Sequence, residues 1–306
     1  MTEPGPGAFP ARGGGAVTIV GLGVMGGSIA KALMRRAPRM RIFGIEPDGE
    51  TAARAAGDGV RLRGALEECE IDGGVVVFAA PLDAVATLLR TTRATWTRAA
   101  LATDVTSLKV PVLEAVGRGA AGRHVFVGAH PMCGSERSGY GAAEADLFDG
   151  ADVFLCPPGE EPGTPAAHAE EGAGAPRGTG PIERARTFWR FLGGRPRVVA
   201  AARHDRVMAW ASHLPQLLAS ALASSLEEAA IGHDELGPGG RDMTRLAGSN
   251  PDMWAPLLEA AAKEDAGALR AVEVRLAAAR RMLERGDFAG VRDMLERGRR
   301  WTAATR

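Results

Sequence analysis

The first half of the chain alternates short apolar runs with stretches that carry apolar residues at every third or fourth position. The apolar runs are rich in β-branched residues and end in polar or glycine-rich turns, as buried parallel strands do. The predicted strands lie within residues 17–20, 41–46, 73–81, 98–107 and 123–131. With helical stretches between them, this pattern predicts a Rossmann-type doubly wound parallel sheet.

The second half of the chain has a different pattern. Residues 158–180 are mainly Pro, Gly, Ala and Glu without periodicity, which predicts a flexible loop. Apolar residues then recur at helical spacing within residues 182–193, 202–231, 251–263 and 266–285. We expect a disordered tail over residues 1–15, a dinucleotide-binding domain over 16–181 and an all-helical substrate and dimerisation domain over 182–306. The cleft between these domains is the expected site.

Four glycines crowd into the seven residues after the first predicted strand, in the sequence GLGVMGG. Gly21 can adopt the tight turn, Gly23 leaves room for a pyrophosphate, and Gly26 lets the next helix pack closely on the strand. Val24 and Met25 complete the turn. The N–H groups and the dipole of the helix that follows favour an anion, so the turn predicts a dinucleotide site.

Glu46 ends the second predicted strand, at the position where the ribose-binding acid of such a site belongs. A carboxylate accepts a hydrogen bond from a free 2′-hydroxyl but repels a 2′-phosphate. No arginine follows Glu46 immediately to bind that phosphate. The sequence therefore predicts NAD as the cofactor in preference to NADP.

Composition narrows the classes of partner. Lys and Arg total 37, as do Asp and Glu, so neither nucleic acid nor an anionic membrane is an expected partner. The three cysteines form neither a disulfide framework nor a zinc site, and no metal is expected. No apolar run is long enough to cross a bilayer and no signal peptide is evident, which favours a cytoplasmic enzyme with a small-molecule substrate.

Residues just after the strands of such a sheet face the ligand, and two of them carry candidate chemistry. Ser107 follows the strand within 98–107 and can either cap the next helix or form a hydrogen bond in the site. His130 ends the strand within 123–131. A histidine there is often only a satisfied polar residue, but an imidazole beside the nicotinamide can act as a general base at neutral pH.

Six segments together resemble the prephenate and arogenate dehydrogenase family of tyrosine biosynthesis, in colinear order from about residue 16 to about 290. They are VGLGVMGGSIAKAL, DVTSLK, FVGAHPMCGSERSGYGAAEADLF, HD at 204–205, SHLPQ at 212–216 and RDMTRLAGSNPDMW at 241–254. The resemblance implies oxidative decarboxylation of a cyclohexadienol. Hydride passes from C4 to NAD⁺, the C4 hydroxyl loses its proton, the ring carboxylate leaves as carbon dioxide, and the ring becomes aromatic.

The resemblance also implies roles for individual residues. His130 would accept the hydroxyl proton, and Ser107 would orient His130 and the nicotinamide. Arg245 matches the substrate-binding arginine, whose planar guanidinium suits a carboxylate, and Asp205 matches the acid that pairs with it. His213 would lie near the substrate or be a buried structural histidine.

Gln216 departs from the family pattern, because many members carry histidine at this position. A glutamine cannot become cationic and its amide oxygen can accept from an ammonium, so we expect arogenate to be used at least as well as prephenate. The helical domain carries more apolar residues than it can bury alone, which predicts a homodimer through this domain. No appended regulatory domain is expected.

Three alternatives remain open from the sequence. One is the same chemistry on 4-amino-4-deoxyprephenate in secondary metabolism. Another is an enzyme of the β-hydroxyacid dehydrogenase or imine reductase type, which shares the glycine turn and a helical second domain. The last is a non-catalytic protein that senses NAD.

Overall fold

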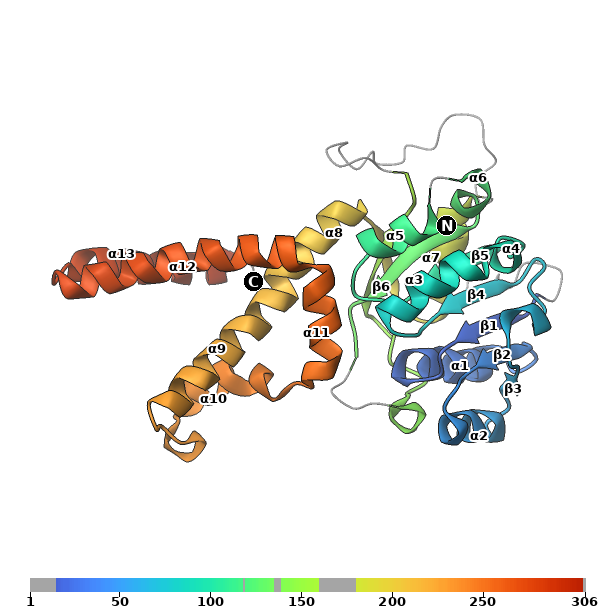
Figure 1. Ribbon diagram of the computed structural model, residues 1–306, viewed down its shortest axis with the longest axis horizontal. Helices are drawn as coiled ribbons and strands as arrows, with labels where there is room; N and C mark the ends of the chain where they lie inside the picture. Colours follow the sequence, from blue (N-terminus) through green and yellow to red (C-terminus); the bar gives the residue numbers. More distant parts are fainter. Residues whose placement is uncertain (1–14, 118, 135–138, 160–179, 305–306) are drawn as a thin grey trace, which may run out of the picture. The chain divides into compact units, whose positions relative to one another are not determined.

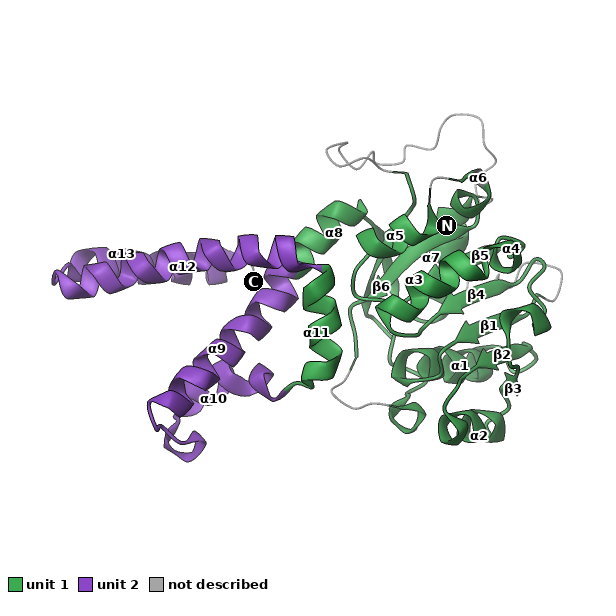
Figure 2. Cartoon of the chain, viewed as in Figure 1, with its two compact units in different colours: residues 1–208, 249–260 green, residues 209–248, 261–306 purple. Residues whose placement is uncertain are grey.

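The computed structural model describes residues 15–117, 119–134, 139–159 and 180–304. The expected tail over 1–15 and the expected loop over 158–180 lie largely outside these residues. The chain forms two compact units, shown in different colours in Figure 2. Unit 1 comprises residues 1–208 and 249–260, and unit 2 comprises residues 209–248 and 261–306.

Unit 1 contains a sheet whose described strands follow the order β3-β2-β1-β4-β5-β6-β7-β8, of which Figure 1 labels β1 to β6. The strands are β1 (Val17–Val20), β2 (Ile42–Ile45), β3 (Arg61–Leu62), β4 (Val75–Phe78), β5 (Leu101–Asp104), β6 (Phe126–Pro131), β7 (Asp152–Cys156) and β8 (Arg195–Val198). Neighbouring strands from β3 to β6 are parallel, β7 is antiparallel to β6, and β8 is parallel to β7. The predicted Rossmann-type parallel sheet is confirmed.

Helices of unit 1 connect these strands and cover both faces of the sheet. The longer segments are α1 (Val24–Arg36), α2 (Gly49–Gly57), α3 (Leu82–Thr91), α4 (Arg93–Trp96), α5 (Val110–Val116), α6 (Ala120–Arg123), α7 (Pro181–Phe191), α8 (Ala201–Met208) and α11 (Pro251–Ala260). Short 3-10 turns lie at η1 (Leu66–Glu68) and η2 (Tyr140–Ala142).

Side chains of the central strands point alternately to the two faces of the sheet, and a separate apolar core lies on each face. Val75 and Val77 of β4 pack into one core with residues of α1 and α7, whereas Val76 and Phe78 pack into another with residues of α3 and α5. Successive side chains of a strand point to opposite faces, so a strand that is apolar throughout is buried on both. The β-branched runs of the sequence therefore form the centre of the sheet.

Strand β8 was not predicted. It belongs to unit 1, which therefore extends further along the chain than the expected dinucleotide-binding domain. The sequence RPRV alternates charged residues and contains Pro196, so it lacks the apolar run of a buried strand. β8 lies at the edge of the sheet, where a proline is tolerated. Because α7 and β8 pack with the sheet, the compact units divide after Met208, later than the domain boundary expected after residue 181.

Unit 2 is helical in its described residues. Its elements are the π-helix η3 (Ala209–His213), α9 (Leu214–Glu228), the 3-10 turn η4 (His233–Glu235), α10 (Pro238–Thr244), the 3-10 turn η5 (Arg245–Gly248), α12 (Ala262–Glu284) and α13 (Phe288–Ala304). A helical second domain was expected, but the expected range 182–306 also contains strand β8, which belongs to unit 1. None of the described helices is long and apolar enough to cross a membrane.

Candidate functional site

The glycine turn connects β1 to α1 as the sequence predicts. Gly21 has a φ of 92°, and a Cβ on it would lie 2.6 Å from the Ala79 carbonyl oxygen. A Cβ on Gly26 would overlap the Gly21 carbonyl oxygen, so α1 can begin this close to β1 only with glycine there. Gly23 precedes α1 and has open space around the position of its missing Cβ. Helix α1 thus begins with neither a side-chain cap nor an acidic residue in its first turn, which suits an anionic ligand.

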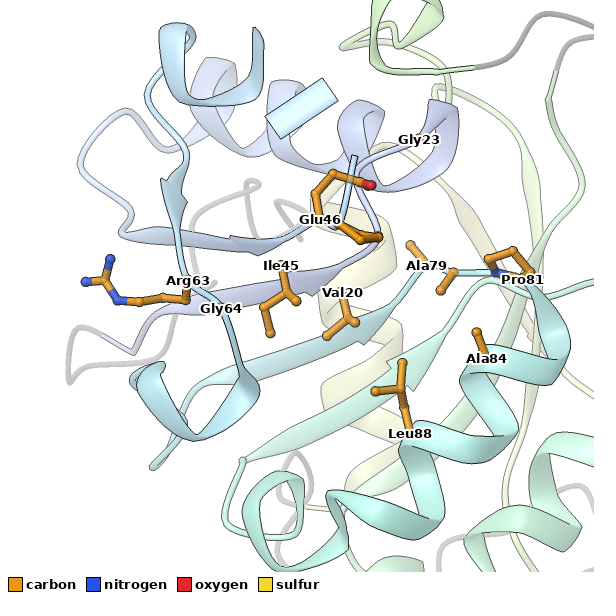
Figure 3. Close-up of a pocket in the computed structure, with 13 residues that line it drawn as sticks. Val20, Gly23, Ile45, Glu46, Arg63, Gly64, Ala79, Pro81, Ala84 and Leu88 are labelled. Atoms are coloured by element: carbon orange, nitrogen blue, oxygen red, sulfur yellow. The ribbon is translucent and has the colours of Figure 1, made fainter. Parts of the chain in front are cut away.

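A cavity of about 670 Å³ opens beside this turn (Figure 3). It lies at the carboxyl ends of β1, β2 and β4, where the strand order reverses and ligands of such sheets bind. Gly21, Gly23 and Glu46 line it, whereas Val24 and Met25 form the first turn of α1. The structure therefore places three of the predicted cofactor residues around one cavity.

The carboxylate of Glu46 is held at the mouth of the turn. Its Oε2 accepts from the backbone N–H of Leu22 at 2.7 Å, and its Oε1 accepts from that of Asp48 at 3.0 Å. Each oxygen can accept a further hydrogen bond, so the carboxylate can still accept hydrogen bonds from ribose hydroxyls.

Arg63 is the arginine that also lines this cavity, but its guanidinium is engaged elsewhere. Its Nη1 donates to the Leu62 carbonyl at 2.7 Å, and its Nε donates to the Glu68 carbonyl at 3.3 Å. The guanidinium lies over the Phe43 ring, and in Figure 3 it points away from Glu46. Arg63 is thus not poised to bind a phosphate beside Glu46.

The second cluster of unit 1 surrounds His130. His130 lies near the end of β6, whose carboxyl end is on the same edge of the sheet as those of β4 and β5. Its Nδ1 lies 2.9 Å from Nε2 of His204 on α8, and Nδ1 of His204 lies 2.7 Å from Asp205 Oδ1. His204 is buried, with 1% of its surface exposed.

Asp205 also holds the start of α5. Its Oδ1 accepts from the N–H of Lys109 and its Oδ2 from the N–H of Val110, both at 2.8 Å. The sequence resemblance assigns Asp205 to a pair with Arg245. Arg245 belongs to unit 2, so that pairing stays a prediction, whereas the contacts of Asp205 to α5 and His204 are part of unit 1.

A buried ion pair lies under the loop that carries Ser107. Lys109 Nζ contacts Asp104 Oδ2, and both side chains are fully buried. Lys109 Nζ also donates to the Ala129 carbonyl at 2.6 Å, and Asp104 Oδ1 accepts from the Ala129 N–H at 3.0 Å. The residue before His130 is therefore held from both sides. Ser107 is half-buried in this loop, and its predicted contact with the nicotinamide stays a prediction.

In unit 2 the side chain of Gln216 contacts the turn that begins at Arg245. Gln216 of α9 donates from Nε2 to the carbonyl of Leu246 at 2.9 Å, in the turn η5 that begins at Arg245. A carbonyl can only accept, so the amide nitrogen faces η5 and the amide oxygen points elsewhere. That oxygen is buried and has no hydrogen-bond partner among the described residues. Arg245 itself is exposed.

His213 is buried at the end of the π-helix and contacts α12. Its Nδ1 lies 2.9 Å from Asp265 Oδ1, and the two residues are 1% and 5% exposed. Burial raises the pKa of the Asp265 carboxyl, and the hydrogen bond from His213 partly opposes that rise. This pair joins η3 to α12, which agrees with the structural alternative for His213; its substrate role stays a prediction.

The described residues offer neither a reactive thiol at Cys133 nor a cluster of metal ligands. Burial raises the pKa of the Cys133 thiol to about 11, so this residue is a poor nucleophile at neutral pH. Within the described part of the chain, no three His, Cys, Asp or Glu side chains gather closely enough to hold a metal ion.

Family models identify both halves of the chain. Residues 29–170 match the model described as prephenate dehydrogenase, nucleotide-binding domain, and residues 200–297 match prephenate dehydrogenase, dimerization domain. The chain belongs to the prephenate dehydrogenase family. The first half therefore carries the family's nucleotide-binding domain, in agreement with the glycine turn.

Individual relatives agree with this assignment. The chain is 29% identical to the prephenate dehydrogenase of Bacillus subtilis (strain 168), over 79% of this chain and 63% of that protein. It is 25% identical to the cyclohexadienyl dehydrogenase of Zymomonas mobilis, over 79% of each. The chain thus spans less than two thirds of the Bacillus protein. The prephenate dehydrogenase from A. aeolicus, solved with hydroxyphenyl propionate and NAD⁺, has the same fold, with a TM-score of 0.76 at 23% identity over 94% of this chain and 96% of that one.

Two residues of the site were not singled out by sequence reasoning. Lys109 appears in the sequence only as the last residue of the motif DVTSLK, and His204 only as the first residue of the motif HD. The signal for Lys109 was its place five residues after Asp104, at the end of a strand that is otherwise apolar. His204 gave no local signal, because its partner His130 is 74 residues away.

Proposed function

We propose that this protein oxidises and decarboxylates a prephenate-type cyclohexadienol, with NAD⁺ as the hydride acceptor. The observation that carries this proposal is the cluster around His130, on the same edge of the sheet as the cavity beside the glycine turn. The family assignment supports it. The named activities of the relatives cover prephenate and other cyclohexadienyl substrates.

The residues divide the work between acid-base chemistry and binding. His130 accepts the proton of the C4 hydroxyl, and the ring carboxylate leaves as carbon dioxide as the ring becomes aromatic. Arg245 binds a substrate carboxylate, for which a guanidinium supplies two parallel donors. Ser107 orients His130 and the nicotinamide. The glycine turn and Glu46 hold the pyrophosphate and the ribose of the cofactor.

The direct test is NADH formation with prephenate, arogenate and 4-amino-4-deoxyprephenate under identical conditions. Turnover of prephenate or arogenate is the expected result. Turnover of the amino analogue alone would assign the same chemistry to secondary metabolism. NAD⁺ binding without turnover of any of the three would contradict the proposal.

Glu46 is expected to make NAD⁺ the better cofactor by at least about tenfold in kcat/KM over NADP⁺, because its charge repels a 2′-phosphate and its oxygens can accept from a 2′-hydroxyl. Glu46→Gln keeps an oxygen for the Leu22 N–H and removes the charge, so it should narrow this ratio. Glu46→Ser should narrow it too, with weaker binding of both cofactors. Steady-state kinetics and calorimetry with both cofactors measure these effects. Equal kcat/KM in the wild type would overturn the assignment.

Gln216 is expected to favour arogenate, or at least not to disfavour it. Its amide oxygen is buried without a donor among the described residues and can accept from the ammonium that distinguishes arogenate from prephenate. Gln216→His should shift the kcat/KM ratio of the two substrates toward prephenate. A wild-type preference for prephenate above about tenfold, or an unchanged ratio in the variant, would remove Gln216 as the discriminating residue.

We infer that unit 2 forms a homodimer. Large apolar side chains are more than half exposed along α12 and α13: Val274, Leu276, Leu283, Phe288, Leu295 and Trp301. Large apolar side chains exposed in this number are typical of a subunit interface, and the match to the family's dimerization domain agrees. Light scattering after size exclusion at micromolar concentration should give twice the chain mass; a monomer would contradict the inference.

A further inference from the structure

His204 contacts the proposed base directly and has a fixed orientation. The rings of His130 and His204 meet edge to face, with centroids 5.1 Å apart and planes at 74°. Phe154 packs against His204 in the same way, with centroids 5.4 Å apart. Phe154 pairs with His130 across the β6–β7 register, so one pair of strands supplies both rings that surround His204. The imidazole of His204 is therefore held in place by packing as well as by hydrogen bonds.

The hydrogen bonds of Asp205 determine where the protons lie. Backbone N–H groups can only donate, so both oxygens of Asp205 accept, from Lys109 N and Val110 N, which favours the carboxylate form. His204 Nδ1 must then donate to Asp205 Oδ1. A neutral imidazole has one N–H, so Nε2 of His204 is an acceptor and Nδ1 of His130 donates to it. In neutral His130 the lone pair consequently lies on Nε2.

We propose that His204 is a positioning residue that, together with Asp205, holds His130 in the tautomer with a basic Nε2. This inference rests on the proposed function, in which His130 accepts the hydroxyl proton. That proton adds to Nε2 and makes His130 an imidazolium, while Nδ1–H stays hydrogen-bonded to His204. The negative charge of Asp205, one imidazole further away, stabilises the cation, as the acid of a Ser-His-Asp triad stabilises its histidine.

The surrounding charges agree with this assignment. From α8 come His204 and Asp205, and the neighbouring Arg203 and Arg206 are exposed. From the start of α5 comes Lys109, whose ammonium is turned toward Asp104 at the end of β5. That pair is neutral overall, and among the described residues Asp205 is the carboxylate that contacts His204.

The test compares His204→Phe with His204→Gln. Phenylalanine can keep the packing on Phe154 but offers no hydrogen bond, whereas the glutamine oxygen can still accept from His130. We expect His204→Phe to lower kcat by about 10- to 100-fold, the scale seen when an orienting partner is removed, with the Kd for NAD⁺ by calorimetry unchanged. His204→Gln should recover much of that loss. His124→Gln, at an exposed histidine just before β6, is the matched control and should behave as the wild type.

Two further readouts separate positioning from loss of structure. With ¹⁵N-labelled histidine, NMR should show neutral His130 protonated at Nδ1 in the wild type and a mixture of tautomers in His204→Phe. His130→Asn identifies the signal. The rise of kcat/KM with pH should move to lower pH in His204→Phe, because the imidazolium of His130 loses its acceptor.

A wild-type His130 protonated at Nε2, or a His204→Phe variant with unchanged kcat and tautomer, would overturn the positioning role. The tautomer measurement needs no substrate. Failure of every dienol to react would therefore count against the proposed function alone.

Discussion

Replacing His130 with asparagine is expected to lower kcat by about 10²- to 10⁴-fold, the contribution of a positioned general base. Asparagine has a similar size and can still meet His204, but it cannot take the hydroxyl proton. The Kd for NAD⁺ should stay unchanged, because His130 is not among the residues that line the cavity beside the glycine turn. A loss confined to kcat would show that the imidazole acts in the chemical step.

The pH dependence gives a second, independent check on His130. Only the neutral imidazole can accept a proton, so kcat/KM of the wild type should be low in acid and rise as His130 deprotonates. His130→Asn should lose that rise. His124→Asn makes the same substitution at an exposed histidine and should keep both the rate and the profile. Near-normal turnover in His130→Asn would refute the assignment of the base.

The sequence predicts those parts of the site that depend on local backbone geometry. The backbone at position 21 has a positive φ, and α1 packs too closely at position 26 for a side chain, so both positions require glycine. The sequence shows this as glycines at fixed spacing after a β-branched run. Glu46 and His130 are predictable because they end strands, and the carboxyl ends of parallel strands lie at one edge of the sheet.

Other parts could not be predicted, because they depend on contacts between distant segments. His204 acquires its role only when α8 packs beside β6 and β7. Strand β8 lacks an apolar run because an edge strand with a polar face does not need one. The π-helix at Ala209–His213 cannot be recognised from apolar residues at three- and four-residue spacing, although its last residue forms the buried pair with Asp265.

Lys109 is the clearest case in which tertiary structure overrides the sequence pattern. A lysine in a helical stretch is normally exposed, yet its side chain is fully buried. Three acceptors explain this burial: the ammonium donates to Asp104, to Thr106 Oγ1 and to the Ala129 carbonyl. The backbone N–H of Lys109 donates to Asp205. The same residue therefore links the strand ends of β5 and β6 to helix α8.

Lys109→Met is accordingly expected to lower the free energy of unfolding of unit 1 by about 3–5 kcal/mol, because it leaves the carboxylate of Asp104 buried without its cation. Methionine matches the length of the lysine stem, so packing is largely kept and the loss reports the charge. Denaturant unfolding followed by the fluorescence of the buried Trp96 and Trp189 would measure it. Arg98→Met removes the exposed ion pair with Asp72 and should cost less than about 1 kcal/mol.

The double variant Asp104→Asn with Lys109→Met separates the cost of an unpaired charge from the value of the pair itself. Removing both charges leaves no ion buried alone, so the double variant should be more stable than Lys109→Met despite carrying one more substitution. A double variant that loses the sum of the two single effects would mean that Lys109 and Asp104 act independently. The buried pair would then not be what holds Ala129, and with it the base His130, at the end of β6.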